Sequence, residues 1–285
     1  MILTAPAKIN LVLEVLSKRP DGYHEVRGVL QAINLCDTLS FEPAAELHFL
    51  CEDPAWDAGK SLVVRAAEKL REKTGVALGA AVHIVKDIPL SSGLGGDSSD
   101  AVAVLTGLDR LWKTGVPRDE LSSIAAELGS DVPFFLGGST ALASGRGEVV
   151  SPLPGLPPAW VIILMPKVEI PKSKTADLYS RIKPAHFTDG SAAEKMVAGI
   201  KRGKTFDPSS LYNVFEKVAY EAFPGLKKYR DDFQEAVESP VHLAGAGPSL
   251  FAFVRDWEES VRVVSSLREK GLEALVSRTL NSSLL

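Results

Sequence analysis

The first half of the chain alternates between strand-like and helix-like spacing of hydrophobic residues. Short runs rich in β-branched residues predict strands at residues 9–16, 24–34, 38–42, 47–51 and near Val82. Apolar residues at helical spacing predict helices at 62–73, 101–112 and 118–128. Two further strands are predicted at 139–143 and 148–153, around a glycine-containing turn. This half is therefore expected to combine a sheet with several helices.

A proline-rich stretch divides the chain. Residues 151–158 contain four prolines in eight positions, which is typical of a stiff connector. We therefore predict two domains, 1–153 and 154–285. Strands are expected beyond the connector at 160–165, 241–243, 250–254 and near 275–276, and helices at 176–182, 192–201, 212–220, 226–237 and 257–270. Because several adjacent strands are close enough to pair antiparallel, this mixture favours an α+β fold over a doubly wound parallel sheet.

Composition narrows the class of protein. The 285 residues are 45% hydrophobic and 24% charged, as in ordinary globular proteins, and the net charge of −4 gives no basic footprint for nucleic acid. Two cysteines, Cys36 and Cys51, in a chain of this length suit a reducing compartment. No apolar run is long enough to span a bilayer, and Met1 is not followed by a signal-peptide pattern. We expect a cytoplasmic protein with no membrane partner.

Residues 89–101, Pro-Leu-Ser-Ser-Gly-Leu-Gly-Gly-Asp-Ser-Ser-Asp-Ala, join a predicted strand to a predicted helix. A helix N-terminus exposes unpaired N–H groups and carries partial positive charge. Gly93, Gly95 and Gly96 would let an anion approach the backbone, and Ser98 and Ser99 add hydroxyl donors. The stretch predicts a phosphate cradle. Taken alone it also fits a turn that binds nothing, since glycine-rich turns before helices are common.

Three common phosphate-binding patterns do not fit. The dinucleotide fingerprint that starts at Gly93 needs glycine at its sixth position, where Ser98 stands. Gly59-Lys60-Ser61 ends like a Walker A loop, but that motif needs glycine where Pro54 stands. The His-Arg-Asp and Asp-Phe-Gly motifs of protein kinases are absent from the sequence.

The stretch from Pro89 to Ser99 instead resembles the second motif of the GHMP small-molecule kinases, which include galactokinase, homoserine kinase and mevalonate kinase. Residues 5–10, Ala-Pro-Ala-Lys-Ile-Asn, resemble the N-terminal motif of that family, and residues 243–249 resemble its C-terminal glycine loop. Residues 21–25, Asp-Gly-Tyr-His-Glu, and 128–134 narrow the resemblance to members that act on a cytidine diphosphate-linked methylerythritol in the non-mevalonate route to isoprenoid precursors. These motifs span nearly the whole chain in the expected order.

The resemblance implies a two-domain fold with the active site in the cleft between the domains. The N-terminal, ATP-binding and catalytic domain would resemble domain 2 of ribosomal protein S5, and the C-terminal, substrate-binding domain would be ferredoxin-like. The implied activity is ATP-dependent phosphorylation of the acceptor's 2-hydroxyl, with ATP and Mg²⁺ as cofactors and a monomer or homodimer as the assembly. No metal ligands can be identified from the sequence. A GHMP-type kinase for another small alcohol and a non-catalytic nucleotide-binding homologue remain alternatives.

Lys8 and Asp131 match the family's catalytic pair. Transfer of a phosphoryl group to an alcohol needs help for the hydroxyl nucleophile, and a nearby carboxylate can take its proton. An ammonium group beside it would draw charge from the activated oxygen. From the residues alone, Asp131 as a turn residue and Lys8 as a surface charge remain open; the resemblance implies catalysis for both.

The remaining candidates divide between acceptor and nucleotide. A cytosine ring suits an aromatic face and groups that complement its donor–acceptor edge, although a Tyr and a His capping a hairpin is the simpler explanation of that pair alone. The resemblance places Asn10, Tyr23, His24, Thr175 and Tyr179 at the acceptor. It places Lys86 and Pro89 beside adenine, and Gly93, Leu94, Gly95, Gly96, Asp97, Ser98 and Ser99 at the ATP phosphates. Asn213 and Glu216 are interpreted as structural.

Two positions depart from the family pattern. Relatives usually have glycine where this chain has Asp97, and often have asparagine where it has Ser61. A carboxylate facing a triphosphate would repel it unless it turns outward, caps the helix or helps to hold Mg²⁺, and of these we favour a cap of the helix. A serine also reads adenine less fully than an asparagine, which puts ATP affinity in question.

Overall fold

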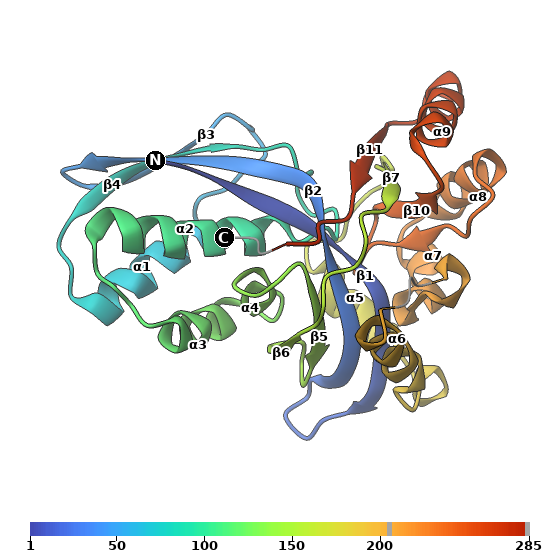
Figure 1. The fold of residues 1–285 in the computed structure, drawn as a ribbon, viewed down its shortest axis with the longest axis horizontal. Coiled ribbons are helices and arrows are strands. Elements are labelled where there is room, and N and C mark those ends of the chain that lie inside the picture. Colours follow the sequence, from blue (N-terminus) through green and yellow to red (C-terminus); the bar gives the residue numbers. More distant parts are fainter. Residues whose placement is uncertain (204–206, 283–285) are drawn as a thin grey trace.

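The computed structural model describes residues 1–203 and 207–282, and it contains two β-sheets, the first of which is built on two long strands (Figure 1). β1 (Ile2–Lys18) and β2 (His24–Ala44) form an antiparallel pair that runs through most of the molecule. The first sheet has the order β3-β4-β2-β1-β8, and β5 and β6 continue it from β2. Its other strands are β3 (Leu47–Cys51), β4 (Gly79–Val85), β5 (Thr140–Ser144), β6 (Val149–Pro152) and β8 (Tyr212–Asn213).

Helices pack together below the first sheet and bury its main core (Figure 1). α2 packs directly on β1 and β2, while α1 and α3 pack against α2 and each other. A Cβ at Gly107 of α2 would lie 2.5 Å from the Phe41 ring, so this glycine allows the helix to approach the sheet closely. The helices are α1 (Leu62–Thr74), α2 (Gly96–Trp112), α3 (Arg118–Leu128) and the single turn α4 (Val132–Phe135).

The second sheet is antiparallel, with the order β11-β7-β10-β9. Its strands are β7 (Trp160–Leu164), β9 (His242–Leu243), β10 (Leu250–Val254) and β11 (Ala274–Arg278). α9 packs on β7 and β11, and α8 packs on α9. The helices of this half are α5 (Lys174–Arg181), α6 (Ser191–Lys201), α7 (Ala219–Ala222), α8 (Leu226–Ala236) and α9 (Trp257–Glu269), with 3-10 turns η1 (Pro184–His186), η2 (Pro208–Ser210) and η3 (Val214–Lys217).

A third core lies between the two sheets. It joins Ile9 and Leu11 of β1 to Ile163 of β7 and Phe251 of β10, and all four side chains are buried. β8 also pairs with β1 in the first sheet, although it lies in the predicted second domain, after residue 153. A large apolar interface restricts relative motion of two layers, so the two sheets are fixed relative to each other.

The α+β prediction is confirmed, but the helix predicted at 212–220 is wrong. Tyr212 and Asn213 form β8 beside β1, and the chain then turns through η3 before the short helix α7. The side chain of Asn213 accepts a hydrogen bond from Phe215 N and so caps η3. A buried capping residue and strand pairing therefore override the helical spacing of this segment.

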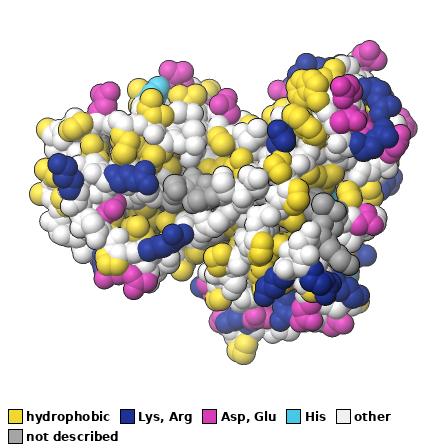
Figure 2. Space-filling view, in the orientation of Figure 1, with side chains coloured by type: hydrophobic (Ala, Val, Ile, Leu, Met, Phe, Trp, Pro, Cys, Tyr) yellow, Lys and Arg dark blue, Asp and Glu magenta, His cyan; other side chains and the backbone are white. Residues whose placement is uncertain are grey.

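The surface has mixed charge on the face shown in Figure 2, where Lys and Arg lie among Asp and Glu on the right-hand lobe. On α8, two such pairs are i,i+4 neighbours: Lys227 with Asp231 and Lys228 with Asp232. Both cysteines are free. Among the helices of the described residues, none has the length and apolar character needed to cross a bilayer.

Candidate active site

Two adjoining cavities form one cleft. The smaller, of about 380 Å³, is lined by residues of β1 and β2, by the loops before α2 and α4, and by α5 itself. The larger, of about 770 Å³, is lined by the β1–β2 turn, α5 and η1. The residues that line both are Ser130, Arg146, Thr175 and Tyr179. The cleft is thus lined from both sides of residue 153.

Lys8 and Asp131 meet in the smaller cavity. Lys8 Nζ lies 3.2 Å from Asp131 Oδ2 and donates a hydrogen bond of 2.9 Å to Asn10 Oδ1. The Lys8 side chain is 4% exposed, whereas that of Asp131 is 42% exposed. The structure therefore brings together an anchored cation and an accessible carboxylate that lie more than a hundred residues apart in the sequence.

The first glycine loop, which we define as residues 89–96, lies directly over Lys8. Lys8 N donates to Leu94 O at 2.8 Å. A Cβ at Gly95, which has φ +78°, would lie 3.0 Å from Lys8 Cγ and 3.1 Å from Phe135 Cζ. Glycine at position 95 therefore supplies both the left-handed backbone and the space that the Lys8 side chain occupies.

α2 starts at Gly96, five residues earlier than predicted, so its N-terminus belongs to the loop itself. The first hydrogen bond within the helix runs from Ser99 N to Gly95 O, and Gly95 offers no capping side chain. The amides of residues 96–98 precede this bond, and Ser98 lines the smaller cavity. An uncapped N-terminus of this kind is a ready anion site.

Two other residues of the predicted phosphate cradle, Leu94 in the loop and Ser99 in α2, point inward. Leu94 is buried in the core between the sheets, and Ser99 is 2% exposed. Within the described residues, Ser99 Oγ has no hydrogen-bond partner. These two positions contribute packing and, for Leu94, a backbone carbonyl; their side chains do not line either cavity of the cleft.

The second glycine loop, which we define as residues 244–248, packs against the first. A Cβ at Gly93 would overlap Ala244 O, and Ser249 N donates to Ser92 O at 3.1 Å. Asn213 Nδ2 donates to Leu243 O and Gly245 O, at 2.9 and 2.8 Å. Glu216 Oε1 accepts from Leu243 N at 2.9 Å. The structural interpretation of Asn213 and Glu216 is therefore confirmed.

Lys86 does not line the cleft. Its buried ammonium lies 2.5 Å from Asp37 Oδ2 and 2.7 Å from Asp100 Oδ2, beneath the first glycine loop. Burial, with a smaller contribution from Asp37, raises the pKa of Asp100. Pro89, which follows this cluster, is half-buried and is also absent from the lining of both cavities. Lys86 is thus held in a buried ion-pair cluster, and its place beside a nucleotide base stays a prediction.

The prediction that Asp97 caps α2, the helix to which it belongs, is wrong. Its Oδ1 accepts a 2.6 Å bond from Ser61 Oγ, and its Oδ2 accepts from Leu62 N at 3.1 Å. Ser61 in turn accepts from Val63 N as the N-cap of α1. The two departures from the family pattern are therefore partners: Asp97 fixes the start of α1 to the first turn of α2.

The larger cavity has an aromatic wall, which we define as Tyr23, His24, Tyr179 and Phe187. The His24 and Tyr179 rings stack with centroids 5.1 Å apart and an interplanar angle of 14°. Phe187 meets His24 edge-on, with centroids 6.3 Å apart. Thr175 and Tyr179 share one face of α5, as their spacing predicted, and line both cavities.

The ring nitrogens of His24 suit recognition of a polar heterocycle. Burial, followed by the charge of Lys18, lowers the pKa of His24 below its usual value. His24 is therefore neutral near pH 7 and presents one donor and one acceptor nitrogen.

Sequence reasoning missed two cations of the cleft. Arg146 lines both cavities, and its guanidinium lies over the Tyr23 ring with Cζ 4.8 Å from the centroid. Lys174 lines the smaller cavity next to Thr175. The Gly-Arg-Gly turn at 145–147, with its positive-φ glycines, was the available signal for Arg146; Lys174 had none beyond its place next to Thr175.

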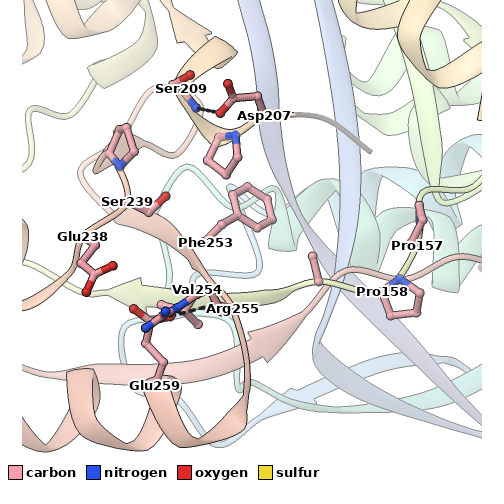
Figure 3. Close-up of a pocket in the computed structure, with 13 residues that line it drawn as sticks. Pro157, Pro158, Asp207, Ser209, Glu238, Ser239, Phe253, Val254, Arg255 and Glu259 are labelled. Carbon is pink, nitrogen blue, oxygen red and sulfur yellow. Dashed lines mark hydrogen bonds and ion pairs between the residues drawn. The ribbon is translucent and has the colours of Figure 1, made fainter. Parts of the chain in front are cut away.

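Another cavity, of about 510 Å³, lies outside the cleft beside β10 (Figure 3). Figure 3 shows Arg255 meeting Glu259 at one side of it and Asp207 accepting a bond from Ser209 N at the other. It shares no lining residue with either cavity of the cleft. None of the site residues predicted from the sequence lines this third cavity.

Comparison with known proteins agrees with this geometry. Residues 61–149 match the family model of the GHMP kinases N terminal domain. A relative from Dehalococcoides mccartyi, named 4-diphosphocytidyl-2-C-methyl-D-erythritol kinase, is 48% identical over 280 residues that cover 98% of each chain. One of the same name from Pelotomaculum thermopropionicum is 40% identical, with both chains fully covered. The chain belongs to the 4-diphosphocytidyl-2-C-methyl-D-erythritol kinase family.

Solved structures of GHMP kinases are similar to this chain over almost its whole length. A crystal structure of 4-(cytidine 5'-diphospho)-2C-methyl-D-erythritol kinase matches with a TM-score of 0.82 and 32% identity, covering 98% of this chain and 99% of the other. A mevalonate kinase structure matches with a TM-score of 0.71 at 14% identity, covering 99% and 100%. The predicted GHMP kinase fold is therefore confirmed.

Proposed function

We propose that this protein transfers the γ-phosphoryl group of ATP to the 2-hydroxyl of 4-diphosphocytidyl-2-C-methyl-D-erythritol, a step in the non-mevalonate route to isoprenoid precursors. The observation that carries the proposal is the position of the Lys8–Asp131 pair. It lies between an uncapped helix N-terminus and a cavity with an aromatic wall. A kinase for a cytidyl-linked alcohol needs three subsites in this order: one for the ATP phosphates, one for the reacting hydroxyl and one for the cytosine ring.

In this reaction the acceptor oxygen attacks the γ-phosphorus while its proton passes to Asp131. The bond from the γ-phosphorus to the β–γ bridging oxygen breaks, and ADP leaves with the electron pair. Lys8 donates to the attacking oxygen and limits its developing charge. Asn10, which accepts from Lys8 Nζ, holds the ammonium in place.

The first glycine loop would hold the ATP phosphates. The free amides of residues 96–98 and the Ser98 hydroxyl provide donors, and the dipole of the long helix α2 favours negative charge at that end. The carboxylate of Asp97 does not oppose this, because it is held by Ser61 and Leu62.

The larger cavity would take the cytosine base. Tyr23, His24 and Tyr179 provide ring faces, and the neutral His24 provides a donor and an acceptor for the base edge. Arg146 lines the boundary between the cavities, where the diphosphate of such a substrate must lie. A guanidinium there can bind phosphate oxygens bidentately.

Mg²⁺ is expected to accompany ATP. Within residues 1–203 and 207–282, no three His, Cys, Asp or Glu side chains gather as metal ligands. In phosphoryl-transfer sites Mg²⁺ is held by one or two carboxylates together with substrate phosphates and water. The Ser98 hydroxyl, which lines the smaller cavity, is the side chain that fits such a partial role, and the metal would neutralise phosphate charge.

The direct test measures ADP formation by the purified protein with ATP and the cytidyl substrate, compared with mevalonate, homoserine and galactose. We expect turnover with the cytidyl substrate and inhibition by cytidine diphosphate. Turnover with one of the other alcohols alone would favour a kinase for another acceptor. Nucleotide binding without any turnover would favour a non-catalytic homologue.

A further inference from the structure

Lys174 lies in the cleft but has no role in the reaction proposed above. It is the first residue of α5, and its Nζ donates to Ser91 O at 2.7 Å and to Gly247 O. Ser91 belongs to the first glycine loop and Gly247 to the second. One ammonium group therefore bridges both loops where they meet.

The remaining donor of Lys174 is available to a ligand. An ammonium group has three N–H donors, and two of them bind the loop carbonyls. In the part of the chain that the structure describes, the third has no partner, and Lys174 lines the same cavity as Lys8, Ser98 and Asp131. An acceptor in this cavity would complete its hydrogen bonding.

The charges around Lys174 favour an anion. The charged groups that face it are Lys8 of β1 and Asp131 before α4, and from the two glycine loops it faces backbone carbonyls. Burial, followed by the charge of Lys8, lowers the pKa of Lys174 to about 8. Two cations beside one carboxylate leave an excess of positive charge that a phosphoryl group would balance.

We propose that Lys174 is a further catalytic residue, whose third N–H donates to a non-bridging oxygen of the phosphoryl group during its transfer. This rests on the proposed function. As the bond to the β–γ bridging oxygen breaks and the bond to the acceptor oxygen forms, Lys174 keeps its proton and neutralises charge on the group in transit. Asp131 alone takes the hydroxyl proton.

The test compares Lys174→Met with Lys172→Met, which removes an exposed lysine two residues earlier. We expect Lys174→Met to lower kcat by about 100-fold or more, as loss of a transition-state donor does. KM for both substrates and the affinity for ADP should change by less than about threefold. Lys172→Met should behave as the wild type. A Lys174→Met variant that loses thermal stability but keeps its kcat would show that Lys174 only ties the loops together, and would overturn the proposal.

Lys174→Arg provides a second, independent readout. The wild-type kcat/KM for ATP should fall as the pH rises through about 8, because Lys174 loses its proton in the free enzyme. Arginine stays protonated, so this alkaline decline should be absent in Lys174→Arg. An identical decline in both proteins would contradict the proposal.

These outcomes separate the two claims. A wild-type protein that transfers no phosphoryl group to the cytidyl substrate would refute the proposed function. Wild-type turnover combined with equal kcat values for Lys174→Met and Lys172→Met would refute only the role of Lys174.

Discussion

The region around Lys8, Asn10 and Asp131, which we call the floor of the cleft, and the aromatic wall are built in different ways. At the floor, Lys8 is 3% exposed, its backbone amide binds the first glycine loop, and its side chain is held by Asn10 and Asp131. In the wall, Tyr23 is 56% exposed and is covered on one face by Arg146. The floor is fixed by the hydrogen bonds of the buried Lys8, whereas the wall is held by ring contacts among exposed and partly buried side chains.

This difference separates two kinds of kinetic effect. Groups held rigidly around the reacting atoms act mainly in the transition state, so their loss lowers kcat. Groups that bind a remote part of the substrate act in the ground state as well, so their loss raises KM. Variants of Arg146, which lies beside the wall, and of Asp97, which lies next to the first glycine loop, can therefore test whether the two regions work independently.

The largest effect on binding is expected for Arg146→Met. Loss of charged hydrogen bonds to the diphosphate should raise KM for the cytidyl substrate by roughly 10- to 100-fold. kcat and KM for ATP should stay within about threefold of the wild type. Initial-rate kinetics at saturating ATP measures this, with Arg110→Met, an exposed arginine of α2, as the matched control. A loss confined to kcat would place Arg146 in the reaction and would contradict the assignment of this part of the cleft to substrate binding.

A smaller effect is expected for Asp97→Gly. The variant loses the bonds to Ser61 Oγ and Leu62 N at the start of α1, which should lower the free energy of unfolding by about 1–2 kcal/mol. Turnover should remain, because the carboxylate does not face the phosphate cradle. Urea unfolding and steady-state kinetics on the same preparation check both points. If kcat fell while stability stayed unchanged, the carboxylate would take part in the chemistry.

Local pattern was sufficient for the regular elements and for the first glycine loop, since hydrophobic spacing and glycine positions are encoded nearby. It failed at residues 212–220, because Asn213 binds carbonyls 30 and 32 residues away and its segment pairs with β1. For Asp97 it identified an unusual residue but not its partner, which lies 36 residues earlier. These features depend on tertiary contacts that no local window contains.

Dependence on tertiary contacts also explains which residues of the candidate site could be predicted from the sequence. Lys8 and Asp131 were found through motif resemblance, and the structure brings them within 3.2 Å. The ion pairs of Lys86 could not be predicted, because its two carboxylate partners, Asp37 and Asp100, lie 49 and 14 residues away. Lys174 was missed because its acceptors lie 83 and 73 residues away.

The central claim is that Lys8 and Asp131 serve one acceptor hydroxyl, and a double-mutant cycle on the single-turnover rate tests it most directly. Lys8→Met, Asp131→Asn and the double variant would be mixed with ATP and the cytidyl substrate, after equilibrium binding has shown that both ligands remain bound. Each single variant should be slower by about 10³-fold, and the double variant about as slow as either one, because residues that act as a unit are not additive. Losses that multiply in the double variant, or a near-normal rate for Asp131→Asn, would contradict the account.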